Sequence, residues 1–464
     1  MDHVISRKKV CIQGLGFVGA AMSLAVASAK NNEGNALYDV VGIDLPHDEG
    51  KRRINSLNEG IFPFESTDAK LMEAMKEAAA NGNLRGSTDH VEFEDADYVI
   101  VDINLDISYK DGNTYLDLSA FKKAITTLGQ RIKQDCLVIV ETTVPPGTCQ
   151  KVVHPIIEEM FKKRGLDPEN IRIAHSYERV MPGAEYFDSI VNFWRVYSGI
   201  DERSADLCEA FLKTVIRTDK YPLTRLEGTV STETAKVLEN SYRAATIAFM
   251  EEWGRFAEAV GFDLFKVIDA IRMRPTHSNM RQPGFGVGGY CLTKDPFFAK
   301  LAARDLYGLA GMDFPFSTQA VQFNNRMPLV SLEKIDELLK GLAGKKLLIL
   351  GISYRQDVGD TRYSPSEIFA REAIRRGAEI DCQDPLVDYW EEMGKPVRKE
   401  LPSLENYDAV ILAVQHKQYL GIRFDKIEKK MLVFDANRVL SDSQISEIRN
   451  NKNLCFYSIG RGAI

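Results

Sequence analysis

The sequence contains no stretch of the roughly 20 consecutive apolar residues that a membrane-spanning helix needs. Its first residues, MDHVISRKK, lead within a few positions into an apolar run and a glycine-rich turn, which leaves no room for the apolar core of a secretory leader. Low-complexity tracts and short-period repeats are also absent. We therefore expect a cytoplasmic globular protein that has no membrane partner.

Cysteine is sparse and shows no pairing pattern. Seven cysteines are scattered over the 464 residues without a single CxxC pair, which argues against a disulfide framework and against a zinc site. The formal net charge of −7 leaves no basic excess with which to neutralise nucleic-acid phosphates. We expect no bound metal and no nucleic-acid partner, so an anionic ligand has to be held by local groups.

Short apolar runs alternate with helical stretches in both halves of the chain, whose length favours two or three domains. Strands that alternate with helices predict a parallel sheet with helices on both faces, the α/β fold class. Residues 231–261 contain no proline and predict one long helix, and a second α/β domain begins near residue 330. The predicted strands lie at 8–13, 38–44, 97–102 and 136–142, and then at 345–350, 378–381, 409–414 and 431–435.

A glycine-rich turn follows the first predicted strand. Gly14, Gly16 and Gly19 form a GxGxxG pattern that opens a helix, where the backbone can approach a pyrophosphate at the positive helix end. Asp44 ends the next strand, where a carboxylate binds a ribose 2′-hydroxyl and repels a 2′-phosphate, so the pattern predicts NAD rather than NADP. Asp44 follows Gly14 by 30 residues instead of about 20, because a polar insert lies near 30–35. The alternative is a glycine turn in a domain that binds no nucleotide.

A second glycine-rich segment, PGFGVGGYCLTKDP at 283–296, places four glycines ahead of Cys291 and the pair Lys294 and Asp295 behind it. Glycines let the backbone approach a ligand, and a lysine three residues away favours a thiolate or an oxyanion. The segment therefore predicts a cysteine nucleophile. The alternative is a cysteine that only fills a small space in the core.

Several motifs in a fixed order resemble the UDP-glucose/GDP-mannose dehydrogenase family over nearly the whole chain. They are the glycine turn, ETTVPPGT (141–148), YERVMPG (177–183), ETAKVLENSYRA (233–244), PGFGVGGYCLTKDP (283–296) and GDTRYSP (359–365). The resemblance implies two Rossmann-like doubly wound domains joined by a long central helix, which also forms the contact of a homodimer. It implies an NAD-binding domain at 1–222, a central helical domain with the catalytic loop at 223–328, and a UDP-sugar-binding domain at 329–464.

The resemblance also implies catalytic roles at matching positions. Cys291 resembles the family's nucleophile, and Lys294 with Asp295 resembles the pair that handles protons and the oxyanion. Glu178 resembles the carboxylate that directs water. Without the resemblance, a glutamate of this kind is as readily interpreted as a surface residue.

Further contacts with the substrate and the cofactor follow from the same resemblance. Lys236 and Asn240 lie four residues apart, hence on one face of the predicted helix, and resemble the pair that faces the sugar. Arg362 resembles the residue that reaches the cofactor from the second domain. The other implied contacts are Phe17, Val18 and Thr143 for the cofactor, and Glu178, Arg179, Phe285 and Gly286 for the substrate.

Arg355 and Arg438 occupy positions where this family places basic residues against the phosphates of the nucleotide sugar. Arg355 replaces the usual lysine, and arginine is a good bidentate phosphate ligand. The alternative for both arginines is a surface ion pair.

Three places depart from the family pattern. Residues 101–106 read VDINLD in place of a Val-Pro-Thr-Pro turn, Tyr177 replaces a common proline, and Tyr290 replaces a serine or histidine. Cofactor contacts at 101–106 are therefore not predicted. None of the seven histidines falls in a matched catalytic motif, so we interpret them as structural or solvated.

The resemblance implies an NAD-dependent enzyme that oxidises the C6 alcohol of a UDP-sugar to the uronic acid, through a thiohemiacetal and a thioester on Cys291. YERVMPG resembles the branch that acts on UDP-N-acetylhexosamines, whereas Lys294 resembles the UDP-glucose branch. We favour a UDP-N-acetylhexosamine. Two alternatives stay open: a one-step NAD-dependent hydroxyacid dehydrogenase that uses Lys236 and Asn240 alone, and a non-catalytic dinucleotide-binding protein.

Overall fold

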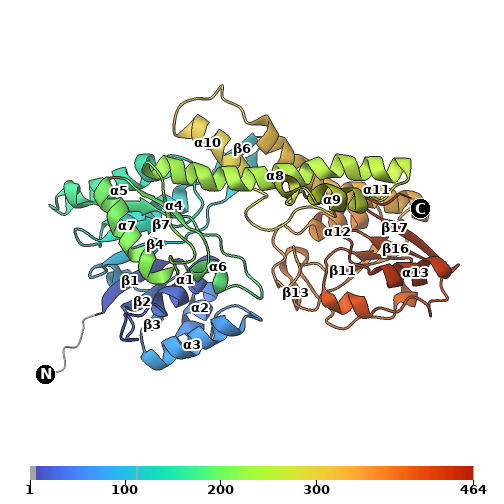
Figure 1. Cartoon of the computed structure of the whole chain (residues 1–464), viewed down its shortest axis with the longest axis horizontal. Helices are drawn as coiled ribbons and strands as arrows, with labels where there is room; N and C mark the ends of the chain where they lie inside the picture. Colours follow the sequence, from blue (N-terminus) through green and yellow to red (C-terminus); the bar gives the residue numbers. More distant parts are fainter. Residues whose placement is uncertain (1–6, 111–112, 463–464) are drawn as a thin grey trace. The chain divides into compact units, whose positions relative to one another are not determined.

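The structure is a computed structural model that describes residues 7–110 and 113–462. The chain divides into two units, one of residues 1–238 with 297–313 and the other of residues 239–296 with 314–464. The division falls inside helix α8 (Gly228–Val260), drawn in Figure 1. The expected boundary after residue 328 lies within α11 (Pro315–Leu339), and the three-domain division stays a prediction.

The first unit is built on an eight-stranded sheet with the order β10-β9-β8-β7-β4-β1-β2-β3. Neighbouring strands run parallel, except that β9 is antiparallel to β8. The strands are β1 (Lys8–Gln13), β2 (Tyr38–Ile43), β3 (Leu84–Ser87), β4 (Tyr98–Val101), β7 (Leu137–Val140), β8 (Arg172–His175), β9 (Val196–Gly199) and β10 (Thr224–Arg225). The four strands predicted for this half are confirmed as β1, β2, β4 and β7, while the reversal at β9 was not predicted.

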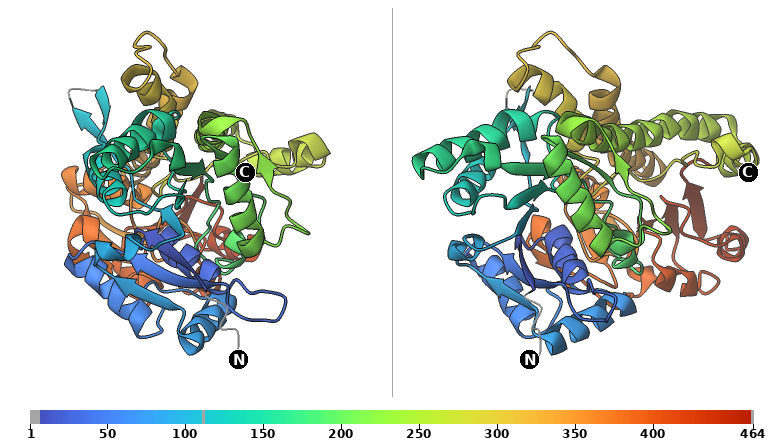
Figure 2. Two further views of the ribbon diagram at one scale, coloured as in Figure 1. Left: turned by 90° about the vertical axis from the view of Figure 1, so that its left-hand side faces the viewer. Right: turned by 60° about the vertical axis from the view of Figure 1, so that its left-hand side comes forward.

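Helices cover both faces of this sheet, as Figure 2 shows. Because both faces are covered, its central strands are continuous apolar runs, and every residue of β4 and β7 is buried. The helices of this unit are α1 (Phe17–Ala27), α2 (Asp48–Asn58), α3 (Ala69–Asn81), α4 (Ser119–Gly129), α5 (His154–Lys163), α6 (Asp188–Val191), α7 (Glu202–Val215) and α10 (Phe298–Asp305), of which α10 lies by the hairpin of β5 and β6. The predicted doubly wound α/β architecture is confirmed.

An antiparallel hairpin follows β4 at the place where residues 101–106 depart from the family pattern. It consists of β5 (Ile107–Lys110) and β6 (Asn113–Leu116), and it contributes no strand to the large sheet. Arg304 of α10 holds the hairpin through a hydrogen bond to the carbonyl of Thr114 (3.1 Å). The departure from the family pattern is thus followed directly by a hairpin that lies outside the large sheet.

The second unit contains a five-stranded parallel sheet with the order β12-β11-β15-β16-β17. Its strands are β11 (Lys346–Leu350), β12 (Glu379–Gln383), β15 (Ala409–Leu412), β16 (Met431–Asp435) and β17 (Leu454–Ser458), and β13 (Tyr389–Trp390) pairs separately with β14 (Lys395–Pro396). Besides α11, its helices are α9 (Leu264–Arg272), α12 (Pro365–Arg375) and α13 (Asp442–Asn450). The four strands predicted here are confirmed as β11, β12, β15 and β16.

Helix α8 extends over 33 residues, which agrees with the long helix predicted at 231–261. Val237, Ala244 and Ala248 are buried, whereas Leu238 and Phe249 are exposed. No helix in the part of the chain that the structure describes is long and apolar enough to cross a membrane.

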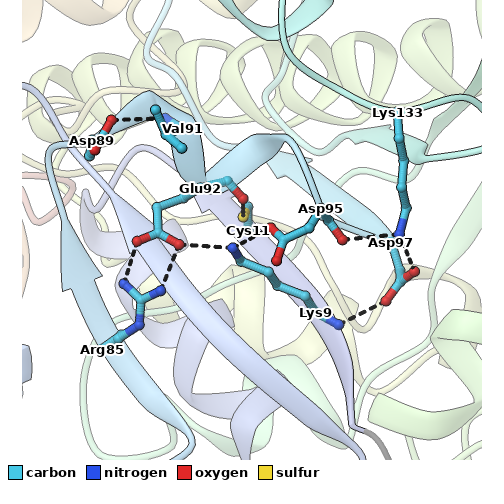
Figure 3. Close-up of polar contacts among 9 residues, drawn as sticks. All are labelled: Lys9, Cys11, Arg85, Asp89, Val91, Glu92, Asp95, Asp97 and Lys133. Carbon is cyan, nitrogen blue, oxygen red and sulfur yellow. Dashed lines mark hydrogen bonds and ion pairs between the residues drawn. The ribbon is translucent and has the colours of Figure 1, made fainter.

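An ion-pair network ties the amino end of β1 to neighbouring segments (Figure 3). Glu92 accepts two hydrogen bonds from Arg85 (2.7 and 2.6 Å) and a third from Lys9 (2.8 Å). Lys9 also pairs with Asp95, and the Lys9 backbone N–H donates to Asp97 (2.9 Å). Since Gly14 follows the other end of β1, this network stabilises the sheet away from the glycine turn.

Candidate active site

The glycine turn has the geometry that a dinucleotide requires. Gly14 has a φ of +101°, a left-handed conformation that favours glycine, and a Cβ there would overlap the carbonyl of Asp102. A Cβ on Gly19 would overlap the carbonyl of Gly14, so this glycine allows α1 to lie close to β1. Gly16 has no heavy atom within 4 Å of a Cβ position among the described residues, which leaves room for a ligand.

Gly16 is also the N-cap of α1, and no described side chain caps this helix end. The first backbone N–H groups of α1 are therefore oriented toward the place where an anionic pyrophosphate binds. Phe17 and Val18 follow in the first turn, both half-buried, and the Phe17 ring stacks on Phe64 with centroids 4.1 Å apart. The turn therefore fits NAD.

The order of the strands places this turn at a switch point of the sheet. β1 lies between β2 and β4, so the chain runs from β1 to β2 on one side and returns after β3 to β4 on the other, the arrangement that leaves a crevice at the carboxyl ends of doubly wound sheets. Asp102 directly follows β4, and Thr143 follows β7 on the same edge. Ligands of doubly wound folds bind at such an edge.

Asp44 follows β2, and its carboxylate forms two hydrogen bonds and one ion pair. It accepts hydrogen bonds from the N–H groups of Leu15 (3.3 Å) and Leu45 (2.7 Å), and it pairs with Arg53 of α2 (3.2 Å). Glu49 provides a second carboxylate for Arg53 (2.8 Å). The carboxylate that is predicted to bind the ribose is thus hydrogen-bonded to the glycine turn.

Glu178 and Lys236 lie together in the first unit. Lys236 Nζ donates to the carbonyl oxygen of Glu178 (2.8 Å) and lies 3.5 Å from its Oε1, and both residues are buried. Tyr177, which replaces a proline of the family pattern, contacts two cations through its ring: Lys236 at 5.5 Å and Arg179 at 5.5 Å. Arg179 also donates to the Tyr177 hydroxyl (3.2 Å). Three residues predicted for the substrate side, Glu178, Arg179 and Lys236, therefore form one cluster.

A pair of acidic residues at the same sheet edge, Glu141 buried and Asp102 half-buried, was not predicted. Glu141 forms an ion pair with Arg195 (2.5 Å), and Asp102 lies beside Glu141 because β4 and β7 are neighbouring strands. Burial, and then the charge of Glu141, raises the pKa of Asp102 well above its usual range. The departure at 101–106 contains Asp102 and the motif ETTVPPGT contains Glu141, whereas no motif pointed to Arg195.

In the second unit, Asp295 connects helix α8 to the Cys291 loop, the glycine-rich segment at 283–296. Its Oδ2 accepts a hydrogen bond from Asn240 Nδ2 of α8 (2.8 Å), and its Oδ1 pairs with Lys294 Nζ (2.7 Å). All three side chains are buried. Cys291 is exposed, and its carbonyl accepts the N–H of Asp295 (3.0 Å) and of Lys294 (3.4 Å). Four predicted catalytic residues therefore lie in one short network.

The glycines ahead of Cys291 pack closely against other parts of the protein, so no space for a ligand lies at their Cβ positions. A Cβ at Gly288 or Gly289 would come within 2.7 or 2.9 Å of Tyr354, and one at Gly286 within 2.9 Å of Pro365. Phe285 is buried in the core of the second unit, where its ring lies 5.4 Å from that of Phe369. Local packing thus explains these glycines.

The three predicted arginines of the second unit have different surroundings. Arg362 pairs with Asp360 (2.7 Å), and Arg438, with a φ of +54°, lies 5.0 Å from the ring of Phe265. Arg355 is exposed in the loop after β11. Since β11 lies between β12 and β15, this loop stands at the switch point of the second sheet, where a phosphate group can bind.

The fold and the glycine turn define a dinucleotide-binding protein with two α/β units. Family models of the UDP-glucose/GDP-mannose dehydrogenases match the chain in three places: the NAD binding domain at 8–216, the central domain at 230–326 and the UDP binding domain at 348–443. The chain belongs to this family. It is an oxidoreductase that uses NAD and acts on a UDP-sugar, as predicted.

Similar proteins agree with this assignment along the whole chain. A UDP-N-acetyl-D-mannosamine dehydrogenase of Methanocaldococcus jannaschii is 30% identical over 438 residues, which cover 94% of this chain and 92% of that protein. The solved structure of a UDP-D-ManNAc dehydrogenase from Pyrococcus horikoshii has a TM-score of 0.82 at 25% identity, with 98% of this chain and 100% of that chain covered. An NDP-N-acetyl-D-galactosaminuronic acid dehydrogenase of Ralstonia nicotianae is 23% identical over 442 residues, 93% of this chain and 97% of that protein.

Proposed function

We propose that this enzyme oxidises the C6 alcohol of UDP-N-acetyl-D-mannosamine to the carboxylate in two NAD-dependent steps. The network of Asn240, Asp295 and Lys294 behind the Cys291 loop carries the proposal, because a one-step dehydrogenase has no need of an exposed cysteine there. The relative from M. jannaschii supports this choice of sugar among the UDP-N-acetylhexosamines. We keep the division into domains 1–222, 223–328 and 329–464 as part of this proposal.

Bound NAD would supply the hydride acceptor, with one NAD molecule for the first oxidation and a second, bound after the first has left as NADH, for the other. Asp295 accepts the proton of the C6 hydroxyl, through a water shared with Lys294. Its two buried partners fix the orientation of this carboxylate, since Asn240 holds Oδ2 and Lys294 holds Oδ1. The product of the first oxidation is an aldehyde.

The Cys291 thiolate adds to the aldehyde carbon and forms a thiohemiacetal, whose oxidation leaves a thioester. The aldehyde therefore never leaves the enzyme. Glu178 directs a water molecule to the thioester carbon, and the Cys291 thiolate departs as the acid forms. Lys236 keeps Glu178 in place through its carbonyl oxygen and carboxylate.

Binding roles are distributed over both units in the proposal. Gly14, Gly16, Phe17, Val18, Gly19, Asp44, Thr143 and Arg362 bind the cofactor, and Glu178, Arg179, Lys236, Asn240, Phe285, Gly286, Arg355 and Arg438 bind the nucleotide sugar. Arg355 and Arg438 provide the positive charge that the pyrophosphate needs.

The test is a panel of nucleotide sugars with NAD, followed by nicotinamide absorbance and by quantification of the acid. We expect UDP-N-acetyl-D-mannosamine to have the highest kcat/KM, with two NADH formed per sugar. A higher kcat/KM for UDP-glucose or UDP-N-acetyl-D-glucosamine contradicts the choice of sugar. One NADH per substrate indicates the one-step alternative, and NAD binding without turnover on any substrate indicates the non-catalytic alternative.

We also propose a homodimer that forms through α8. Five large apolar side chains of this helix are 44–63% exposed and recur at helical spacing along one stripe: Tyr242, Phe249, Trp253, Phe256 and Val260. A second copy of the chain would remove this stripe from water. Sedimentation at micromolar concentration should give a dimer that the change Trp253→Glu converts to a monomer. A wild-type monomer near 52 kDa contradicts the proposal.

A further inference from the structure

The ring of Tyr290, directly before Cys291, contacts two cations of the second unit. Lys294 Nζ lies 4.3 Å from the centroid of the Tyr290 ring, and Arg362 Cζ lies 5.6 Å from it. Both distances are within the range of about 6 Å in which a ring face attracts a cation. The backbone reinforces this arrangement, since the N–H of Gly289 donates to the carbonyl of Arg362 (3.2 Å).

Lys294 needs such contacts because its side chain is only 5% exposed. A buried ammonium group is costly unless partners replace its water. Asp295 is one partner, at 2.7 Å, but a single ion pair leaves a flexible four-carbon side chain free to pivot around it. The Tyr290 ring supplies a second contact, and two contacts from different residues fix the direction of the side chain.

Lys294 is in turn connected to helix α8, since Asp295 accepts a hydrogen bond from Asn240. A continuous series of contacts thus runs from Asn240 through Asp295 and Lys294 to the ring of Tyr290. Arg362 extends the series to Asp360, with which it pairs at 2.7 Å. Moving the ring would therefore move the ammonium group of Lys294 relative to the carboxylate beside it.

We infer that Tyr290 is a positioning residue, whose ring holds the Lys294 ammonium group where it stabilises the Cys291 thiolate. This inference rests on the proposed role of Cys291 as the nucleophile. The ring acts through its negative face, so phenylalanine can replace tyrosine, whereas an aliphatic side chain of similar size cannot. Among the described residues, the other charged or titratable groups near this loop are Arg362 with its partner Asp360, Tyr354 with its neighbour Arg355, and Tyr363.

Alkylation of Cys291 by iodoacetamide in the full-length protein without substrate tests the inference. Cys291 and Cys455 are exposed and the other five cysteines are buried, so Cys455→Ser provides a background in which the reaction reports Cys291. The rate is measured against pH: its plateau at high pH reports access to the sulfur, and its midpoint reports thiolate formation.

We expect Tyr290→Phe to keep the wild-type midpoint. Tyr290→Leu should raise the midpoint and slow alkylation at neutral pH by about three- to tenfold relative to its own plateau, because the cation–π contact is lost. Thermal unfolding verifies that each variant is folded, and Tyr290→Met replaces Tyr290→Leu if the latter is not. An unchanged midpoint in the folded ring-less variant overturns the inference, as does a Tyr290→Phe midpoint shifted like that of Tyr290→Leu.

A double-mutant cycle separates an effect through Lys294 from a direct one. In a Lys294→Met background, Tyr290→Leu should produce no further shift of the midpoint. A full second shift there overturns the inference, because Tyr290 would then act without Lys294. The midpoint needs no turnover, so it can move as expected even where the measured NADH per sugar contradicts the proposed function, and the two failures are distinguishable.

Discussion

Asp44 at the carboxyl end of β2 pairs with Arg53 of α2, with 3.2 Å between Oδ2 and Nη1. Asp44 also accepts the N–H of Leu15 in the glycine turn, so the same carboxylate orients the turn and neutralises an arginine beside it. The ion pair affects the choice between NAD and NADP, because an arginine here without a carboxylate partner would bind the 2′-phosphate of NADP.

Replacing Asp44 with serine should weaken the preference for NAD over NADP. The substitution removes the charge that repels a 2′-phosphate and frees Arg53 to bind one, so we expect the ratio of kcat/KM values to fall by about tenfold, or ~1.4 kcal/mol. Steady-state kinetics with both cofactors measure this ratio. Adding Arg53→Ala should cancel the gain with NADP, and a wild-type enzyme that uses both cofactors equally would contradict the interpretation of Asp44.

Glu178→Gln should slow hydrolysis of the thioester more than either oxidation. The amide keeps the size of the side chain and can still accept from the N–H of Val180, but it cannot take a proton from water. We expect a rapid burst of two NADH per active site, then a steady rate lower by about 10²–10⁴. Stopped-flow absorbance and the mass of the acylated protein measure both phases. The exposed Glu185 of the same segment is the matched control, and absence of a burst argues against hydrolysis by Glu178.

The ion-pair network of β1 should make stability depend on acid pH. Hydrogen bonds from Arg85, and then from Lys9, lower the pKa of Glu92 from its ordinary value of 4.5 to about 2. Because the folded-state pKa is lowered, this stabilisation is complete above about pH 4.5 and is lost as the pH falls toward 2.

Glu92→Gln should therefore lower the free energy of unfolding by about 1 kcal/mol at pH 7, and the difference from wild type should shrink below pH 4.5. Urea titrations at several pH values measure it. Glu94→Gln is the control, since Glu94 is more exposed than Glu92 and, among the described residues, its carboxylate pairs with Arg131, outside the network of β1. A deficit that does not change between pH 7 and pH 3 would show that the charge of Glu92 is not its cause.

The features that sequence reasoning found are those with a local physical cause. The central apolar runs, such as β4, β7 and β15, became strands because they are buried on both faces, and α8 was visible because 33 residues contain no proline. The glycine turn could be interpreted because the conformation of Gly14 and the close approach at Gly19 depend only on nearby backbone.

The features that it missed depend on contacts between distant segments. Asp102, Glu141 and Arg195 meet only because strands far apart in the sequence are adjacent in the sheet or next to it. The glycines before Cys291 were attributed to a ligand, whereas Gly288 and Gly289 pack against Tyr354, from a loop more than 60 residues away. No periodicity or motif reports such pairings.

Substitution of Cys291 distinguishes the two-step oxidation from both alternatives, the one-step dehydrogenase and the non-catalytic binding protein. Cys291→Ala should abolish formation of the acid while NAD and the nucleotide sugar still bind, because an exposed thiol supplies chemistry rather than most of the affinity. Calorimetry measures binding, and product analysis measures the acid. Cys455→Ala is the matched control, since Cys455 is exposed as well and has no proposed role, and it should behave like wild type.

Cys291→Ser extends the same test to the intermediate. A serine hydroxyl can add to the aldehyde, but the ester that results hydrolyses more slowly than a thioester, so we expect a stalled acyl-enzyme that mass spectrometry detects on residue 291. The wild type should form two NADH per sugar with no aldehyde in solution. Near-normal production of acid by Cys291→Ala would remove the covalent mechanism, because water alone would then complete the second oxidation, and Cys291 would be a residue of loop packing.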